Sequence, residues 1–353
     1  MREILVKILL APFALLYGIV IGSRNILYDW NLLKSAKYNL PVIGVGNLTM
    51  GGAGKTPHVE YMIRLLSPYL VTGILSRGYR RKTKGFRLVQ KTDTSLTVGD
   101  EPLQYRLKYP EVVVAVSESR SIGIPQMLQQ RPDIRVVLLD DSYQHLSVTP
   151  GLNILLTEYY RPYSIDHLLP IGRLREWRSG AKRANIIVVT KCPEQFDPRV
   201  AEALKSSLEL QPHQKVFFSR FVYSLRYHII RGSRHELSDH DELILLSAIA
   251  DESYLLDYLD QKADRVHTMI YEDHHYFSPH EVSLLKQKYE NLKFQNAAIV
   301  TTEKDATRLI LHHKFIREHN LPILVLPLKV SFVDNDGDAF DLMIQNFLLR
   351  FKA

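Results

Sequence analysis

Cysteine is almost absent from this chain of 353 residues, because Cys192 is the single one. One thiol cannot form a disulfide within the chain or build a cysteine-based zinc site, and a reducing compartment is consistent with it. Internal repeats and low-complexity tracts are also missing, which excludes a repeat architecture. No nucleic-acid-binding motif is present either, so we expect no nucleic-acid partner.

The remaining composition is that of a globular protein, with 46% hydrophobic and 24% charged residues. The length allows one large domain or two lobes with a real core. The formal net charge of +7 fits an anionic partner, such as a nucleotide, an anionic lipid or a nucleic acid.

The most informative segment is a glycine-rich stretch between an apolar run and a helix-like pattern, Gly51-Gly52-Ala53-Gly54-Lys55-Thr56-Pro57. Strand, glycine turn with Lys-Thr, then helix is the context of a phosphate-binding loop. The lysine reaches the outer phosphates, the threonine hydroxyl can ligate Mg²⁺, and the helix N-terminus favours the anion. Pro57 suits the first helical turn, where its missing N–H costs nothing.

This loop departs from the consensus G-x-x-x-x-G-K-[ST], because Thr49 stands where the first glycine belongs. Gly51 and Gly52 can supply the turn instead. A chance Gly-Lys-Thr in an ordinary glycine-rich loop is the alternative, and the flanking strand and helix argue against it.

The N-terminus carries a second signal, since residues 4–21 contain Lys7 as their single charge. Eighteen helical residues span about 27 Å, close to the roughly 30 Å of a hydrocarbon core. A cleaved signal peptide is the first alternative, but no clear small-x-small cleavage site follows. A helix lying in the membrane interface is the second, and Lys7 and Pro12 keep it open.

The rest of the chain alternates continuous apolar runs with helical patterns, which predicts parallel sheets covered on both faces. We expect strands at residues 70–75, 112–116, 136–140, 153–157, 185–190, 243–247, 298–302 and 323–326. We expect helices near residues 104–108, 122–130, 200–208, 254–259, 279–289 and 339–351. Alternating aromatic and polar residues at 220–231 predict antiparallel or linking strands. The predicted division is an anchoring helix (1–25), a nucleotide-binding lobe (26–220), linking strands (221–240) and a second α/β lobe (241–353).

Two acidic motifs are candidates for chemistry. Asp140 and Asp141 end an apolar strand, as in the motif that helps to hold Mg²⁺ in phosphate-binding-loop enzymes. Asp100 and Glu101 follow Gly99 just before a predicted helix. The plain interpretation of the second pair is a helix cap with an acidic first turn.

Four further segments are polar or charged. Asp273-His274-His275 could be a metal site, a base paired with a carboxylate or a solvated loop, and the close spacing of its histidines argues against zinc. Residues 77–84 form a basic run, most simply a solvated loop. Residues 173–183 carry basic side chains around Trp177 and suit a membrane interface or a phosphate-bearing substrate, or simply an exposed basic helix. Thr190-Lys191 and Thr301-Thr302-Glu303-Lys304-Asp305 follow strands and could read a nucleotide base.

Together these motifs resemble the tetraacyldisaccharide 4'-kinase family, the lipid A 4'-kinases of Gram-negative bacteria, along most of the chain. The resemblance rests on the N-terminal apolar helix and on a series of motifs in one order: Val45-Gly46-Asn47-Leu48-Thr49 with the glycine-rich loop, Leu75-Ser76-Arg77-Gly78-Tyr79, Gly99-Asp100-Glu101-Pro102, Asp140-Asp141 with Gln144-His145, Gly172-Arg173-Leu174-Arg175-Glu176, Asp273-His274-His275 and Thr302-Glu303-Lys304-Asp305. Thr49 is itself a feature of that family's loop, whereas Ser142 replaces a common glycine.

The resemblance implies an α/β fold with a kinase-like parallel sheet, a second α/β lobe and a membrane helix. It implies transfer of the ATP γ-phosphate to the 4'-hydroxyl of a tetraacyldisaccharide 1-phosphate lipid, giving lipid IVA, at the cytoplasmic face of the inner membrane. ATP and Mg²⁺ are then required, and no obligate protein partner is expected. The alternative is a membrane-tethered ATPase or GTPase switch, which needs neither Asp100 nor the histidine segment.

The resemblance also assigns roles to residues. It implies that Asp100 is the catalytic base, assisted by His274, and that Asp140 and Thr56 serve Mg²⁺. It places five more side chains in the active site, with Asp141 among the catalytic residues and the others binding substrate: Asp141, Gln144, His145, Arg175 and Glu176. The nucleotide is expected on the loop residues Thr49, Met50, Gly51, Gly52, Ala53, Gly54, Lys55 and Thr56.

Overall fold

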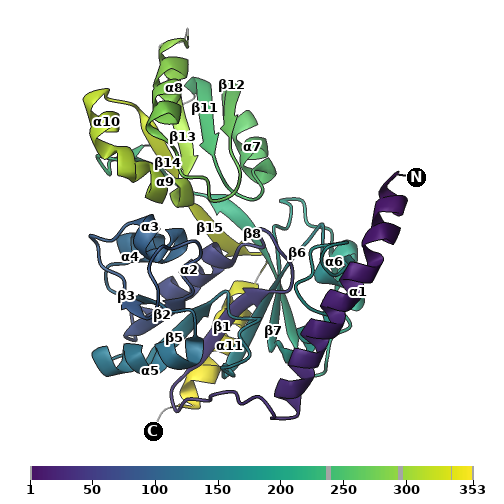
Figure 1. The fold of residues 1–353 in the computed structure, drawn as a ribbon. Helices are drawn as coiled ribbons and strands as arrows, with labels where there is room; N and C mark the ends of the chain where they lie inside the picture. The colour runs from purple at the N-terminus through teal and green to yellow at the C-terminus, as the bar shows by residue number, and fades with distance from the viewer. Residues whose placement is uncertain (1, 236–239, 293–296, 335, 352–353) are drawn as a thin grey trace.

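The computed structural model describes residues 2–235, 240–292, 297–334 and 336–351. The chain forms two α/β lobes, each built around one sheet, and a long N-terminal helix beside the first lobe (Figure 1). This is the fold class that the sequence predicts.

The first lobe contains a nine-stranded sheet in which β1 lies between β6 and β5. In spatial order its strands are β15 (Leu328–Phe332), β8 (Lys215–Tyr223), β7 (Ile186–Thr190), β6 (Leu152–Glu158), β1 (Val42–Asn47), β5 (Val136–Asp140), β2 (Thr72–Ser76), β4 (Val113–Val116) and β3 (Arg87–Leu88). All neighbours pair in parallel except the two edge strands β15 and β3. Parallel pairing brings the carboxyl ends of β1, β5 and β2 to one edge, where ligands bind in such sheets.

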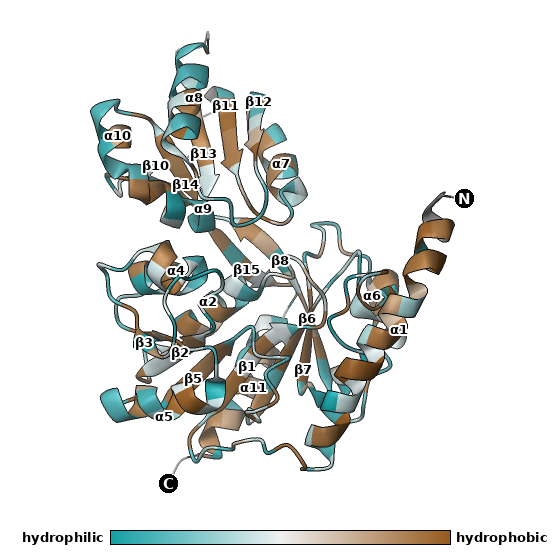
Figure 2. Cartoon of the chain, in the orientation of Figure 1, coloured by the Kyte–Doolittle hydropathy of each residue, from teal (hydrophilic) through white to brown (hydrophobic). Residues whose placement is uncertain are grey.

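Helices cover both faces of this sheet, as its continuous apolar strands require. The helices of the first lobe are α2 (Lys55–Leu66), α3 (Ser95–Val98), α4 (Asp100–Lys108), α5 (Arg120–Gln130), α6 (Pro198–Ser207) and α11 (Asp336–Leu349). Buried side chains of α2 and α11 share one core with β1 and β5, and those of α5 share another with β2 and β4. The brown colouring of the strands in Figure 2 shows this apolar interior.

The second lobe contains a six-stranded sheet with parallel strands at its centre. In spatial order its strands are β10 (Arg234–His235), β9 (Arg226–His228), β14 (Ile323–Leu326), β13 (Ala297–Thr302), β11 (His240–Ser247) and β12 (Ala263–Ile270). Its helices are α7 (Ser253–Asp260), α8 (Pro279–Glu290), α9 (Glu303–Leu309) and α10 (His313–Glu318). The antiparallel strand β9 matches the linking strands expected at residues 220–231.

The chain returns to the first lobe after its second sheet, which the sequence does not reveal. β15 pairs with β8 at the sheet edge, and α11 packs its apolar side chains into the first core. These two elements therefore lie with the first lobe, although they fall inside the predicted range 241–353. The division at residues 221–240, where the chain passes from the first lobe to the second, stays a prediction. The chain passes back to the first lobe before β15.

The N-terminal helix α1 (Arg2–Asp29) runs through Pro12 and lies beside the first lobe, near α6 (Figure 1). It is long and apolar enough to cross a membrane over Leu5–Asp29. Leu9 and Leu16 are more than 60% exposed, so its apolar surface faces away from the protein. One face of α1 packs against the first lobe. Ala14 is buried there, and a side chain at Gly18 would collide with the Trp177 ring.

Candidate active site

The glycine-rich loop connects β1 to α2 at the carboxyl edge of the first sheet. Gly54 caps α2 with φ of 82°, and an added Cβ there would lie 2.6 Å from the Phe221 ring. Both the backbone conformation and the close approach therefore demand glycine at this position.

Five predicted nucleotide-binding residues present amides that donate to no acceptor among the described residues: Gly51, Gly52, Gly54, Lys55 and Thr56. Amides that converge at a helix N-terminus form an anion cradle. Two other members of the predicted set differ, since the Met50 amide donates to the Arg173 carbonyl and the Ala53 amide to the Gly51 carbonyl. These two residues shape the loop through their backbones.

The missing consensus glycine has a structural reason. Thr49 forms an antiparallel bridge with Leu174, and the Asn47 side-chain amide donates to its carbonyl over 2.8 Å. The backbone of a residue in such a bridge is extended, and an extended backbone does not require glycine. The segment 173–175 thus supports the start of the loop in place of a tight turn.

Lys55 lies within a charged network above the loop. Its Nζ donates to Asn47 Oδ1 over 3.1 Å and lies 3.7 Å from Asp141 Oδ1. Arg175 donates from both terminal nitrogens to Asp141, over 3.2 and 3.0 Å, and also to Asn47. Although burial favours the neutral acid, the charges of Lys55 and Arg175 hold the pKa of Asp141 well below its usual range.

Gln144, Glu176 and His145 lie around the same network. Gln144 Nε2 donates to the Asn47 carbonyl over 2.9 Å and to Glu176 Oε1 over 3.1 Å. Glu176 is buried and also accepts from Asn25 of α1 and from Arg183. Burial, together with the nearby Arg120 guanidinium, lowers the pKa of His145 to about 4, so its imidazole is neutral at neutral pH.

The segment 173–183 is therefore no exposed basic helix. Only its end forms a short 3-10 turn, Arg178–Arg183. Three of its arginines pair with acids, and Arg178 donates to the Asp166 carbonyl. Arg173 binds Glu158 and Asp166, both over 2.9 Å. The Trp177 indole donates to the Gly18 carbonyl over 2.7 Å, which joins the segment to α1.

Asp140 and Thr56 offer the hard oxygen donors that Mg²⁺ prefers. Asp140 is buried at the end of β5 and accepts from Ser76 Oγ over 3.2 Å. Burial, and then the charges of Glu101 and Asp141, raise the pKa of Asp140 to about 6. Carboxylates that repel one another at a phosphate cradle suit a divalent cation, so the donor set fits Mg²⁺ shared with a nucleotide. Among the described residues no group of three or more acidic, histidine or cysteine side chains could hold a metal alone.

Asp100 is the first residue of α4 and is buried, while Gly99 takes the capping position. An added Cβ at Gly99 would lie 3.1 Å from the Gly78 backbone, and its φ is 94°, so a glycine must precede the acid. His274 of the second lobe reaches Asp100: its Nδ1 lies 2.9 Å from Asp100 Oδ2. Asp100 Oδ1 is buried and has no hydrogen-bond partner within the described chain. His275 instead contacts Glu281 and lies outside this pair.

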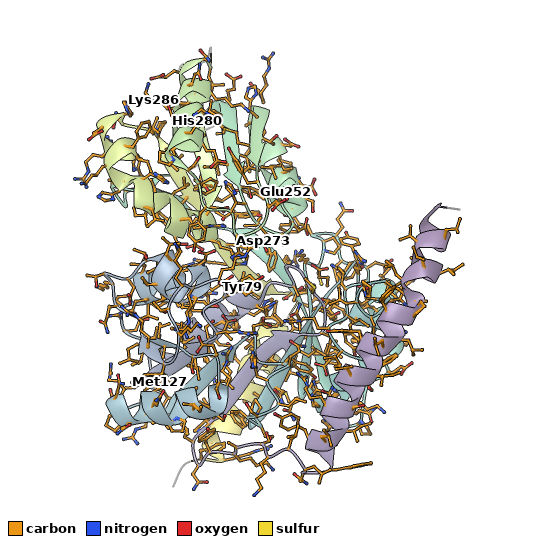
Figure 3. All side chains as sticks on the ribbon, viewed as in Figure 1. Tyr79, Met127, Glu252, Asp273, His280 and Lys286 are labelled. Carbon is orange, nitrogen blue, oxygen red and sulfur yellow. The ribbon has the colours of Figure 1, made fainter. Side chains whose placement is uncertain are left out.

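Residues of the basic run 77–84, which belong to the first lobe, also contact the second lobe. Tyr79 packs against His274 with ring centroids 5.0 Å apart, and Arg80 donates to the Asp273 carbonyl over 3.0 Å. Figure 3 labels Tyr79 and Asp273 on the facing edges of the two lobes. The run is thus a contact of the second lobe as well as an exposed loop. His274 itself has φ of 64°, a left-handed conformation that is uncommon for residues other than glycine and that occurs at functional sites.

Sequence reasoning missed several members of this site, among them Asn47, Arg120 and Arg308. Each forms hydrogen bonds with the backbone or the acids around the site. Arg120, for example, donates to the Asp140 carbonyl over 2.8 Å. The segment at 301–305, which could read a nucleotide base, also has contacts within the protein. Thr302 caps α9, and Lys304 contacts His274. A single sequence contains no spacing pattern that would reveal such hydrogen-bond partners.

A glycine-rich loop with free amides and a lysine, a carboxylate at the end of β5 and a buried acid–histidine pair are together typical of a nucleotide-dependent phosphotransferase. The model of the Tetraacyldisaccharide-1-P 4'-kinase family matches residues 6–348. The chain belongs to this tetraacyldisaccharide 4'-kinase family.

Individual relatives agree. The tetraacyldisaccharide 4'-kinase of Bacteroides thetaiotaomicron is 40% identical over 96% of this chain and 92% of its own length. That of Flavobacterium johnsoniae is 40% identical over 98% of both chains. The crystal structure of LpxK from Aquifex aeolicus in complex with ATP matches with a TM-score of 0.75 and 27% identity, over 97% of this chain and 99% of the other. These matches support the kinase prediction and not the alternative of a nucleotide-driven switch.

Proposed function

We propose that this protein transfers the γ-phosphoryl group of ATP to the 4'-hydroxyl of a tetraacyldisaccharide 1-phosphate lipid, giving lipid IVA. The observation that carries the proposal is the buried Asp100, whose Oδ1 has no hydrogen-bond partner among the described residues and whose Oδ2 contacts His274. A switch that only hydrolyses nucleotide needs no such acceptor for the proton of an alcohol.

The loop amides and Lys55 would hold the β- and γ-phosphates, and Thr56 with Asp140 would hold Mg²⁺, which offsets phosphate charge when bound. Arg175 and Asn47 fix Asp141 and Lys55 in one network, so the lysine is oriented before the nucleotide arrives. Preorganised charge of this kind stabilises a transition state without reorganisation.

Asp100 would accept the proton of the sugar hydroxyl as the oxygen bonds to the γ-phosphorus and the bond to the β-phosphate oxygen breaks. ADP and the phosphorylated lipid are then the products. A sugar hydroxyl is a weak nucleophile, so a positioned base contributes typically 10²–10⁴-fold. Gln144, His145 and Glu176 lie beside this network and are proposed to line the substrate site.

The lipid carries four acyl chains and cannot leave a bilayer cheaply, so the enzyme has to work at the membrane. Helix α1 presents an apolar outer surface, and ATP is a cytosolic substrate, so we infer the cytoplasmic face of the inner membrane. Deleting residues 1–22 is expected to move most of the protein to the soluble fraction with ATP binding retained. Membrane retention of that deletion in high salt would show that another surface is the main anchor.

The direct test is a lipid phosphorylation assay with γ-labelled ATP, with and without the disaccharide acceptor. Label is expected in the lipid, and Lys55→Ala should abolish transfer while the protein stays folded. Rapid ATP hydrolysis with no labelled lipid would favour the switch.

A further inference from the structure

Lys304, the second residue of α9, reaches from the second lobe into the acid–histidine pair. Three acceptors surround its ammonium group: His274 Nε2 at 3.0 Å, and Glu101 Oε1 and Asp273 Oδ1, both at 3.2 Å. Although burial disfavours charge, the carboxylates of Glu101 and Asp273 raise the pKa of Lys304, so it stays charged.

An ammonium group has three N–H donors and no acceptor. A 3.0 Å contact with His274 Nε2 is therefore favourable when that nitrogen carries a lone pair. The single imidazole proton then lies on Nδ1, which donates to Asp100 Oδ2. Each of the three lysine protons has one acceptor. His274 Nε2 also lies 3.7 Å from Asp273 Oδ2, which is beyond hydrogen-bond distance, so Lys304 is its nearest polar neighbour.

We propose that Lys304 is a positioning residue that fixes His274 as the Nδ1–H tautomer, so that His274 holds Asp100 by one oxygen. The other oxygen, Oδ1, stays free for the proton of the sugar hydroxyl. The catalytic consequence rests on the proposed function, whereas the tautomer itself does not.

A second residue of α9 supports this arrangement. Arg308 lies one turn after Lys304, is fully buried and donates to the His275 and Ala248 carbonyls over 3.0 and 3.1 Å. Its Nε lies 3.7 Å from Asp100 Oδ2. Helix α9 thus supports the loop that carries His274 and places positive charge beside the carboxylate. Without Lys304, Nε2 can take the proton, and a lone pair on Nδ1 would then face the carboxylate of Asp100.

The test uses the full chain in detergent with ¹⁵N-labelled histidine, with His274→Gln to assign the signal. The ring nitrogen shifts report which nitrogen is protonated. In the unaltered protein we expect a protonated Nδ1 and a bare Nε2. Lys304→Met should add signal from protonated Nε2, and Lys304→Arg, which also donates and cannot accept, should keep the Nδ1–H form. A protonated Nε2 in the unaltered protein would overturn the proposal.

Lys108→Met is the matched control, because Lys108 also joins the two lobes by ion pairs but does not contact His274. It should leave the His274 signals unchanged. The same change of tautomer in Lys108→Met would mean that lobe packing, and not the Lys304 contact, sets the imidazole proton, which would also overturn the proposal.

Turnover gives the second readout. Lys304→Met should lower kcat about 10- to 100-fold, the loss that is typical when the partner that orients a metal-bound histidine is removed. The KM for ATP should change little, and Lys304→Arg should rescue part of the loss. In the His274→Gln background the same substitution should cost almost nothing. A full, additive loss there would assign Lys304 another role. If the unaltered protein phosphorylates no lipid, the proposed function fails, while the nitrogen shifts still decide the tautomer.

Discussion

Two lysines, Lys108 of α4 and Lys304 of α9, form ion pairs between the lobes, and the acids that they contact differ. Glu303 and Lys304 are neighbours on that helix. Glu303 binds Lys108 of α4 at 2.8 Å, and Lys108 also binds Glu60 of α2 at 2.6 Å. Lys304 instead donates to His274, which in turn contacts Asp100. We name the first group the structural bridge (Glu60, Lys108, Glu303) and the second the catalytic bridge (Asp100, His274, Lys304).

The difference lies in which acids are satisfied. Glu60 in the structural bridge also accepts from Gln104 over 2.8 Å and from Tyr109 over 3.3 Å, so both of its oxygens are engaged. Asp100 in the catalytic bridge keeps Oδ1 buried without a partner in the described chain. Most buried polar atoms are paired, and the described chain has other exceptions, such as Glu242 Oε2, so the contact with His274 is what sets Asp100 apart. The paired acids hold the lobes together, whereas the unpaired oxygen of Asp100 is the one that we propose accepts the proton of the substrate hydroxyl.

The largest effect is expected for Asp100→Asn. The amide keeps the shape of the side chain but cannot accept the hydroxyl proton, so turnover should fall by roughly 10²–10⁴. Nucleotide affinity should change little, because Lys55 and the loop amides remain. Steady-state kinetics with ATP and the lipid acceptor measure both quantities.

The competing interpretation treats Asp100 as an acid that merely favours the start of α4. That role predicts a stability loss of about 0.3–1 kcal/mol and unchanged turnover of the folded fraction. Thermal unfolding and turnover on the same preparations separate the two. A stable variant with normal turnover would remove Asp100 from the mechanism.

A smaller loss of turnover is expected for His274→Ala, because it removes the partner of the base and not the base. The double variant Asp100→Asn/His274→Ala should lose less than the sum of the two logarithmic losses if the pair acts as one unit. Fully additive losses would show that histidine and aspartate act independently.

The third prediction concerns the structural bridge, through Lys108→Met. Removing the cation leaves Glu60 and Glu303 buried without their shared partner, and breaking a buried pair costs about 3–5 kcal/mol. We expect somewhat less, about 2–3 kcal/mol, because the Lys108 side chain is 24% exposed. Denaturant unfolding measures this loss, and turnover of the folded enzyme should stay within about twofold of the unaltered protein. A large fall in kcat without a loss of stability would erase the distinction between the bridges.

The sequence predicts one bridge better than the other, for a physical reason. The phosphate loop, the Asp140-Asp141 pair and the strand order along the chain follow local rules, because turn chemistry and apolar periodicity act over a few residues. Asp100 and His274 entered through their motifs. Lys304 entered through its motif without its contact with His274, and Arg308 did not enter, because these roles depend on α9 packing against α4, about 200 residues away in the chain. The return of β15 and α11 to the first sheet was equally hidden, since edge pairing with β8 is decided by the tertiary fold.

The smallest effect concerns the pH dependence of stability through Glu303. Burial, and then the charge of Glu60, raise the pKa of Glu303 from 4.5 to about 7. The folded protein therefore binds this proton more tightly than the unfolded chain does. Its contribution to stability is fully present below pH 4.5 and is lost as the pH rises through 7.

Glu303→Gln should remove this dependence, because an amide does not titrate but can still accept from Lys108. Relative to the unaltered protein, the variant should gain stability between pH 5 and pH 8, measured by denaturant unfolding at both values. Asp341→Asn is the control, since Asp341 accepts from Tyr61 over 2.8 Å, lies on α11 and is far in sequence from the lobe contact. If Glu303→Gln loses stability equally at both pH values, the carboxylate is held ionised by Lys108 throughout. The structural bridge would then be a fully charged triad, in which the lysine outweighs the repulsion between its two acids.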